Sequence, residues 1–418
     1  MSIKENSSKI KSLTTLVSGN VLAQIIPFLL SPVLSRIYLP SEHASYGVFT
    51  SLVSIFGVTC FFRYEQSILV AEDRHEANTN LWYSLLILSL FTSFVLLLII
   101  LIPKSLLEKW FSLGVIIWLL PIEVLLYGLH LAFENYRIRL GEYKRVAASK
   151  ISKSFGQIGG QIVLGLAGLR TGFGSSLGYS IGTLSSLPSL CTIKRSNTNC
   201  SKGGFRRFLK TYKRFPLLFF PGSLVNMLAI NLTTLFLNEL YDASLVGYYS
   251  FSTKYLGLPI VFIGEAIQKV YIKYAKEEQQ ETGGTKKTYL FVIKLLSLFI
   301  PFFVLFFFVA PICFKFVFGD PWEPAGYVAK ILIPLYAINL LYSPISGICI
   351  LKRKERTFLL LQIMLLISSL IPFIVNAIIG IEFMVYLKIY SGMMCLVYSG
   401  MLAYSSFLNL KGERMENE

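Results

Sequence analysis

Residues 81–103, LWYSLLILSLFTSFVLLLIILIP, form an apolar stretch without a single charged side chain. About 20 apolar residues in an α-helix are enough to cross the hydrocarbon core of a bilayer. The stretch is apolar on every face, which is typical of a helix that contacts lipid. It therefore predicts a transmembrane helix.

The composition of the whole chain agrees with this stretch. Of its 418 residues, 54% are hydrophobic and 15% are charged, and the mean hydropathy is +0.62. Soluble proteins carry about 45–50% apolar and about 25% charged residues. The composition therefore excludes a soluble globular protein and predicts an all-α polytopic membrane protein.

Twelve apolar runs of about 20 residues predict twelve transmembrane helices. Ser, Gly, Thr and Gln dilute the second, fifth and sixth runs, which are the weakest of the set. The predicted spans are 12–34, 46–62, 81–103, 111–134, 147–168, 172–193, 214–238, 244–268, 289–311, 325–351, 358–380 and 383–408.

The uneven distribution of basic residues between the loops predicts the orientation. Translocation disfavours Lys and Arg, so loops rich in them stay on the cytoplasmic side of the membrane. With the N-terminus inside, most of the 39 Lys and Arg residues fall in the alternate loops on that side. Both termini are then cytoplasmic. Topology explains the formal charge of +16, and nucleic acid is not an expected partner.

The most basic loop divides the predicted helices into six plus six. An even number of spans in each half gives the two halves the same orientation in the membrane. The predicted parts are an N-terminal six-helix bundle (1–193), a basic cytoplasmic linker (194–214), a C-terminal six-helix bundle (215–408) and a cytoplasmic tail (409–418).

A weak internal repeat at an offset of 200 residues agrees with this division. Gly47 aligns with Gly247, and Glu65 aligns with Glu265 without a gap. The match is short, so the equal number of spans in each half is its main support.

Cysteine and histidine give no sign of a metal or catalytic centre. The six cysteines are scattered without a short pairing interval, which indicates neither a disulfide framework nor a zinc site. His43, His75 and His130 are far apart in the sequence. We therefore expect no cofactor, no metal and no enzymatic activity.

Several short motifs resemble those of one family of membrane proteins. They are Arg36-Ile-Tyr-Leu-Pro40, Tyr46-Gly47, Arg63-Tyr64-Glu65 with Ile68, Gly141-Glu-Tyr143-Lys144, Phe215-Pro216, Val246-Gly247-Tyr248-Tyr249, and Gly319-Asp-Pro-Trp322-Glu-Pro-Ala325-Gly326-Tyr327. In order and spacing they resemble the polysaccharide-unit flippases of the multidrug/oligosaccharidyl-lipid/polysaccharide exporter superfamily, over residues 12 to 380. Ser41–Ser45 and Glu265 depart from the usual pattern and leave the substrate open.

This resemblance implies a fold, a substrate and a location. The fold would be two helical bundles around a central cavity. The substrate would be a polyprenyl-diphosphate-linked oligosaccharide, flipped by alternating access in the bacterial cytoplasmic membrane for O-antigen or capsule synthesis. Membrane lipid and a polysaccharide polymerase are the further partners it suggests, and we expect the chain to work as a monomer. An H⁺ or Na⁺ gradient is a candidate driving force.

Polar residues within the predicted spans are candidates for the lining of a cavity. A polar stripe follows one helical face of the first span, and a second stripe follows the fifth span. Such stripes also occur where membrane helices pack closely against each other, so both readings stay open. The candidates are Asn20, Gln24, Gln157, Gln161 and Asn226.

Charged residues within the spans are the stronger signal, because an ionised Lys at the bilayer centre costs about 2.5–3.5 kcal/mol. Lys254 lies about ten residues below the outer end of its span, where snorkelling to the headgroups is hardest. Lys153, Lys294 and Lys330 lie nearer the span ends and are weaker candidates. A net positive cavity should hold a diphosphate.

Four further charged residues are candidates for coupling or gating: Arg63, Glu65, Glu123 and Glu265. Glu123 is deep enough either to carry a coupling proton or to neutralise a lysine by a simple ion pair. Lys254 and Glu265 are eleven residues apart, about three helical turns, so we expect them to share one face of the same helix.

Two alternative functions remain open. A drug exporter of the same superfamily is the first, although cationic drugs favour an acidic cavity. A polysaccharide polymerase or ligase is the second, although it would be expected to have a long outer loop, and the longest outer loop here has about 12–15 residues.

Overall fold

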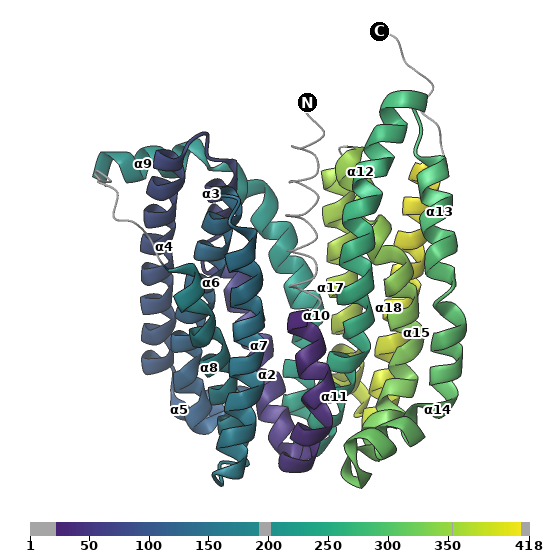
Figure 1. Ribbon diagram of the computed structural model, residues 1–418. Helices are drawn as coiled ribbons and strands as arrows, with labels where there is room; N and C mark the ends of the chain where they lie inside the picture. The colour runs from purple at the N-terminus through teal and green to yellow at the C-terminus, as the bar shows by residue number, and fades with distance from the viewer. Residues whose placement is uncertain (1–21, 192–201, 353, 411–418) are drawn as a thin grey trace. The chain divides into compact units, whose positions relative to one another are not determined.

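The computed structural model describes residues 22–191, 202–352 and 354–410, and these ranges fold into helices joined by short turns (Figure 1). Packing divides the chain into two units, Met1–Gly247 and Tyr248–Glu418.

The first unit contains the helix Leu22–Ile37 and a series of helices whose described members are α2 Pro40–Thr59, η1 Tyr64–Gln66, α3 Ser67–Val70, α4 Arg74–Leu101, α5 Lys104–Phe111, η2 Gly114–Trp118, α6 Leu119–Arg139, α7 Tyr143–Leu166, α8 Gly172–Leu190, α9 Lys202–Thr211, η3 Phe215–Phe219 and α10 Phe220–Leu240. Its main core lies between α2, α4 and α6, where Val48, Leu88 and Val124 are fully buried.

The second unit begins within α11, Ala243–Pro259, and continues through η4 Ile260–Gly264, α12 Glu265–Thr282, α13 Lys286–Ser297, α14 Ile300–Phe318, η5 Asp320–Trp322, α15 Glu323–Ile345, α16 Ile348–Leu351, α17 Glu355–Ile379 and α18 Phe383–Leu410. Its helix α15 packs against both α14 and α18. Both η3 and η4 are π-helical turns. Pro216 is the second residue of η3, and Pro259 directly precedes η4.

Helices α7 and α8 approach each other more closely than side chains normally allow. A Cβ added to Gly182 of α8 would lie 2.6 Å from the carbonyl oxygen of Lys153 and 2.7 Å from the backbone nitrogen of Gln157. Gly178 is equally close to the α7 backbone at Gln161. Small residues at these positions therefore allow the two backbones to pack directly, as in other membrane helix pairs.

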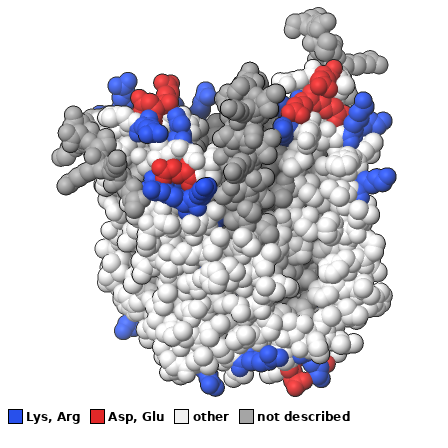
Figure 2. All heavy atoms as spheres, in the orientation of Figure 1, with Lys and Arg blue, Asp and Glu red and all other residues white. Residues whose placement is uncertain are grey.

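The protein is a multi-pass membrane protein. Seven described helices are long and apolar enough to cross a membrane, or eight if the bent pair Pro40–Thr59 and Tyr64–Val70 is one span. Figure 2 shows a broad band of uncharged surface on each unit, with charged side chains gathered near the two ends. The polytopic all-α prediction is confirmed.

The prediction of twelve spans is met only in part. Among the described helices, α7 and α8 correspond to the weak fifth and sixth predicted spans. They are so rich in Ser, Gly and other polar residues that their hydropathy is too low for them to be counted as spans. The first predicted span includes residues 12–21, which lie outside the described residues. Twelve spans in two six-helix bundles therefore stay a prediction.

The division by packing falls after Gly247 and not in the predicted linker 194–214. The physical reason is that α10, assigned from the sequence to the second bundle, packs against α2. The predicted tail 409–418 lies almost entirely outside the described residues.

Candidate functional site

One face of α6 carries a row of polar residues inside the first unit. Glu123, Tyr127, His130 and Glu134 are separated by four, three and four residues, which places them on the same side of the helix. The row extends about 16 Å along the helix axis. It faces α7 and α8, and we call it the α6 seam.

Glu123 lies at one end of the α6 seam, and Lys153 of α7 acts on it electrostatically. Glu123 is fully buried, and its Oε1 accepts a hydrogen bond of 2.8 Å from Thr183 Oγ1. Its Oε2 accepts no hydrogen bond from the described residues. The Lys153 ammonium lies 5.4 Å and 5.3 Å from the ring centres of Tyr127 and Tyr179, and its charge acts on the Glu123 carboxylate.

Glu134 collects a second group of contacts at the other end of the α6 seam. Lys150 Nζ lies 2.7 Å from its Oε1, and His130 Nε2 lies 3.4 Å from its Oε2. The other ring nitrogen of His130 is 2.7 Å from Ser186 Oγ. Sequence analysis missed this group because it treated the three histidines as isolated. The spacing of His130 and Glu134, four residues apart in a predicted span, was the available signal.

The polar stripe of α7 makes contacts within the first unit. Gln157 Nε2 donates to the Tyr46 hydroxyl at 3.1 Å, and Gln161 Nε2 donates to the carbonyl oxygen of Ser175 at 3.0 Å. Gln161 is 3% exposed. These contacts agree with the interpretation that the stripe packs against neighbouring helices.

Two of the other polar candidates lie in described helices. Gln24 is half-buried in the helix Leu22–Ile37, and Asn226 is half-buried in α10. Asn20 lies outside the described residues.

A strained turn separates α2 from η1. Phe62 and Arg63 have φ angles of 49° and 67°, in the left-handed region that non-glycine residues seldom adopt. Each such residue costs about 1–3 kcal/mol and persists only where its surroundings hold it. Such strain is concentrated at functional sites.

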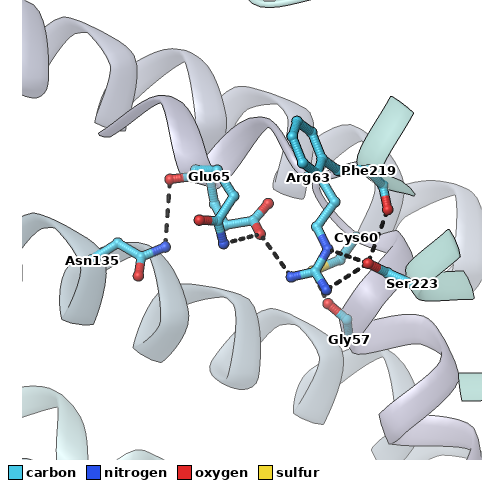
Figure 3. A network of polar contacts seen from close by, with 8 residues as sticks. Gly57, Cys60, Arg63, Glu65, Asn135, Phe219 and Ser223 are labelled. Carbon is cyan, nitrogen blue, oxygen red and sulfur yellow. Dashed lines mark hydrogen bonds and ion pairs between the residues drawn. The ribbon is translucent and has the colours of Figure 1, made fainter. Parts of the chain in front are cut away.

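Arg63 uses this turn to reach α10 (Figure 3). Its Nε and Nη2 donate to Ser223 Oγ at 3.0 Å and 2.7 Å, and Ser223 Oγ donates to the carbonyl oxygen of Phe219 at 2.9 Å. Phe219 is the last residue of the π-helical turn η3. Arg63 therefore contacts α10 where the π-helical turn gives way to the α-helix.

Glu65 supplies the opposite charge. It is 2% exposed, and its Oε1 lies 3.6 Å from Arg63 Nη1. Asn135 Nδ2 donates to its backbone oxygen at 3.4 Å, while the carboxylate Oε2 accepts no hydrogen bond from the described residues. Arg63 and Glu65, two of the candidate coupling or gating residues, therefore lie in contact.

In the second unit the predicted cationic residues lie on three helices. Lys254 is half-buried on α11, with Nζ 5.6 Å from the ring centre of Tyr255. Lys330 is half-buried on α15, with Nζ 5.0 Å from the ring centre of Phe307. Lys294 is exposed on α13.

The proposed shared face of Lys254 and Glu265 assumed one continuous α-helix. The π-helical turn η4 interrupts that helix and changes its phase, so the assumption is wrong. Glu265 is the first residue of α12. Among the described residues, no group of three or more His, Cys, Asp and Glu is arranged to hold a metal ion.

Comparisons with known proteins agree with the motifs found in the sequence. The family model described as "Polysaccharide biosynthesis protein" matches residues 33–326. No curated protein sequence matches the chain.

Solved structures share the fold at low sequence identity. A lipid II flippase, MurJ, in an inward closed conformation has 13% identity and a TM-score of 0.69, with 97% of this chain and 87% of that chain covered. A multidrug resistance MATE family transporter, inward-facing, has 12% identity and a TM-score of 0.65, with 94% and 97% covered. A MOP superfamily transporter from Pyrococcus furiosus has 13% identity and a TM-score of 0.63, with 96% and 95% covered. These similarities show that the chain shares the fold of these proteins.

Proposed function

The chain belongs to the polysaccharide biosynthesis protein family, and we propose that it flips a polyprenyl-diphosphate-linked oligosaccharide across the bacterial cytoplasmic membrane. The observation that carries this proposal is a fold shared with a lipid II flippase over 97% of the chain. A flippase of this kind moves a lipid-linked cargo, and the family match supplies the polysaccharide pathway. Both termini lie in the cytoplasm in this proposal.

The diphosphate of the cargo binds chiefly to cations of the second unit. Lys254 is half-buried at mid-depth of its predicted span. An ammonium group at this depth has a high free energy of insertion, which makes it a candidate functional residue. Lys330 is half-buried and lies against an aromatic ring. Lys153 is a weaker candidate than Lys254 in this proposal, because its ammonium group already lies against the rings of Tyr127 and Tyr179.

Glu123 carries the coupling proton in this proposal. Its free Oε2 is available for protonation, and the α6 seam continues from it through His130 to Glu134. A protonated Glu123 would no longer attract Lys153, so proton binding would change the packing between α6 and α7.

Alternating access requires a contact that breaks and re-forms between the predicted bundles. Arg63 follows α2 and Ser223 is in α10. Their hydrogen bonds join segments that the sequence assigns to different bundles, although both segments lie in the first packing unit of the structure. We assign the gating role to this contact. The basic linker 194–214 is the segment about which the bundles rock.

Transport in proteoliposomes tests the proposal. Purified protein is reconstituted with a fluorescent polyprenyl-diphosphate oligosaccharide, and the labelled lipid that reaches the opposite leaflet is measured with and without an imposed pH gradient. We expect transport that a pH gradient accelerates in the wild type and not in Glu123→Gln. Absence of transport for every lipid-linked sugar, together with export of cationic drugs, would favour the drug-exporter alternative. A requirement for Na⁺ in place of a pH effect would contradict proton coupling but not the flippase function.

A further inference from the structure

A short segment at one end of the first unit concentrates exposed positive charge. Five cationic side chains occur within nine positions, on α9 and in the turn that follows it. No ion pair or hydrogen bond ties these side chains to another described residue. They are Arg206, Arg207, Lys210, Lys213 and Arg214, and all are exposed. We call this group the α9 basic patch.

The apolar side of α9 is already occupied by the protein. Phe208 is 4% exposed, and its ring lies 5.3 Å from that of Tyr83 and 5.4 Å from that of Tyr64. The Tyr64 hydroxyl donates to the carbonyl oxygen of Leu209 at 3.2 Å. α9 is therefore docked crosswise at the end of α4 (Figure 1), and its apolar face is not available for insertion into lipid.

Tyr212 fixes the end of this segment. Its hydroxyl donates to Glu76 Oε1 at 2.5 Å and accepts a hydrogen bond of 3.1 Å from Asn80 Nδ2. Burial and the hydrogen bond to Glu76 raise the pKa of Tyr212 to about 12, so the hydroxyl keeps its proton at neutral pH. Glu76 is thereby engaged by Tyr212. The exposed Glu72 also acts on this hydroxyl, so the five cations of the patch outnumber the acidic groups beside Tyr212.

The residues after the patch set its depth in the membrane. Leu217, Leu218 and Phe219 are 67%, 67% and 56% exposed, and they begin an apolar helix long enough to span the bilayer. Exposed side chains of this kind belong in the hydrocarbon. The patch precedes them by between three and about a dozen residues, so its cations lie at the level of the lipid phosphates.

We propose that the α9 basic patch is a binding surface for the headgroups of anionic phospholipids. Clusters of four to eight Lys and Arg beside a membrane helix attract anionic lipid, at about 1 kcal/mol for each cation near the surface. The guanidinium groups of Arg206 and Arg207 can each donate two hydrogen bonds to one phosphate. Because α9 is docked on α4, its cations are held in place before the lipid arrives, which reduces the entropic cost of binding.

A second basic region of the chain serves as a matched comparison. Lys273, Lys276 and Lys287 are exposed on α12 and α13 of the second unit, where Glu277 lies 3.9 Å from Lys273 and Glu281 is also exposed. Charge of both signs is mixed there, so the attraction for an anionic lipid should be weaker.

Lipid selectivity in nanodiscs tests the proposal. The full chain is placed in phosphatidylcholine nanodiscs with a trace of spin-labelled phosphatidylglycerol or spin-labelled phosphatidylcholine, and the motionally restricted fraction gives the preference for each lipid. We expect the wild type to prefer phosphatidylglycerol. The triple variant Arg206→Gln, Arg207→Gln, Lys210→Gln should reduce that preference at least fivefold, since about 1 kcal/mol for each charge corresponds to about fivefold.

Two further variants make the outcome decisive. Lys273→Gln, Lys276→Gln, Lys287→Gln removes the same number of charges and should leave the preference within twofold of wild type. Arg206→Lys, Arg207→Lys keeps the charge and should retain most of the preference even if the Gln variant unfolds. An unchanged preference in the α9 triple variant, an equal loss in the α12–α13 variant, or no preference in the wild type would overturn the proposal.

Discussion

Arg63 donates two hydrogen bonds to Ser223 Oγ, although 160 residues separate them in the chain. One partner follows a strained left-handed turn at the end of α2, and the other lies in the first turn of α10 after the π-helical turn η3. Both sides of this contact therefore depart from regular helix geometry. Such a contact can open with the loss of few helical backbone hydrogen bonds, because neither partner lies in the middle of a regular α-helix.

Removal of the Arg63 guanidinium should leave a buried charge without its partner. Glu65 is 2% exposed, and its carboxylate lies 3.6 Å from Arg63. We expect Arg63→Ala to lower the free energy of unfolding by about 3–5 kcal/mol, as when one partner of a buried pair is removed. The double variant Arg63→Ala, Glu65→Gln should recover at least half of that loss. Thermal unfolding of each variant in one detergent measures this. No recovery in the double variant would mean that Arg63 acts through Ser223 alone.

How much of this network could be predicted differs between its members. Arg63 and Glu65 were identified from the sequence because they form part of a family-like motif. Ser223 was not, since a single serine in an apolar helix has no pattern of its own, and its partner comes from a turn 160 residues away. The strain at Phe62 and Arg63 was also invisible, because no glycine marks the turn.

The charged residues within the spans show the same limit. Their presence follows from the sequence, but their partners depend on which helices pack together. The sequence makes Lys153 a candidate for a cationic cavity, but it gives no sign that α7 places its ammonium beside the rings of Tyr127 and Tyr179. The internal repeat was more informative: α2 ends at Thr59 and α11 ends at Pro259, 200 residues apart, and an irregular turn follows each helix.

The close approach of α7 and α8 predicts opposite effects for two glycines. Gly182→Ala places a Cβ 2.6 Å from the Lys153 carbonyl oxygen, which must separate the two helices, so we expect a loss of about 1–3 kcal/mol. Gly159→Ala in α7 meets nothing within 4 Å and improves helix propensity, so we expect no loss or a gain of up to about 1 kcal/mol. Thermal unfolding in detergent compares the two variants. Equal effects would contradict direct backbone packing at Gly182.

Surface labelling tests the predicted orientation. Trp322 is 1% exposed and stacks on Phe251 at 3.8 Å, so it is unsuitable as a probe position. The Asp320 side chain beside it is 86% exposed, and Lys210 of α9 is also exposed. In a cysteine-free background, an impermeant maleimide added to intact cells should label Asp320→Cys and spare Lys210→Cys. Permeabilised cells, in which both positions should react, are the control. The reverse pattern in intact cells would place the termini outside.

Lys254 and Lys153 are both candidates for binding the diphosphate, and Lys254 is the stronger candidate from the sequence. A charged hydrogen bond to phosphate is worth about 1.5–3 kcal/mol, so Lys254→Ala should weaken the binding of a polyprenyl diphosphate by about 10- to 150-fold. Lys254→Arg keeps the cation and should retain most of the affinity. The double variant Lys153→Met, Glu123→Gln removes one charge of each sign from the α6 seam. We expect its affinity to stay within about threefold of wild type, because the Lys153 ammonium lies against Tyr127 and Tyr179 and is not assigned to the ligand. Equilibrium binding of a fluorescent polyprenyl diphosphate to each purified variant measures this, with circular dichroism to verify folding. Wild-type affinity in Lys254→Ala would exclude α11 as the diphosphate site. A loss in the double variant as large as that expected for Lys254→Ala would place the site at the α6 seam.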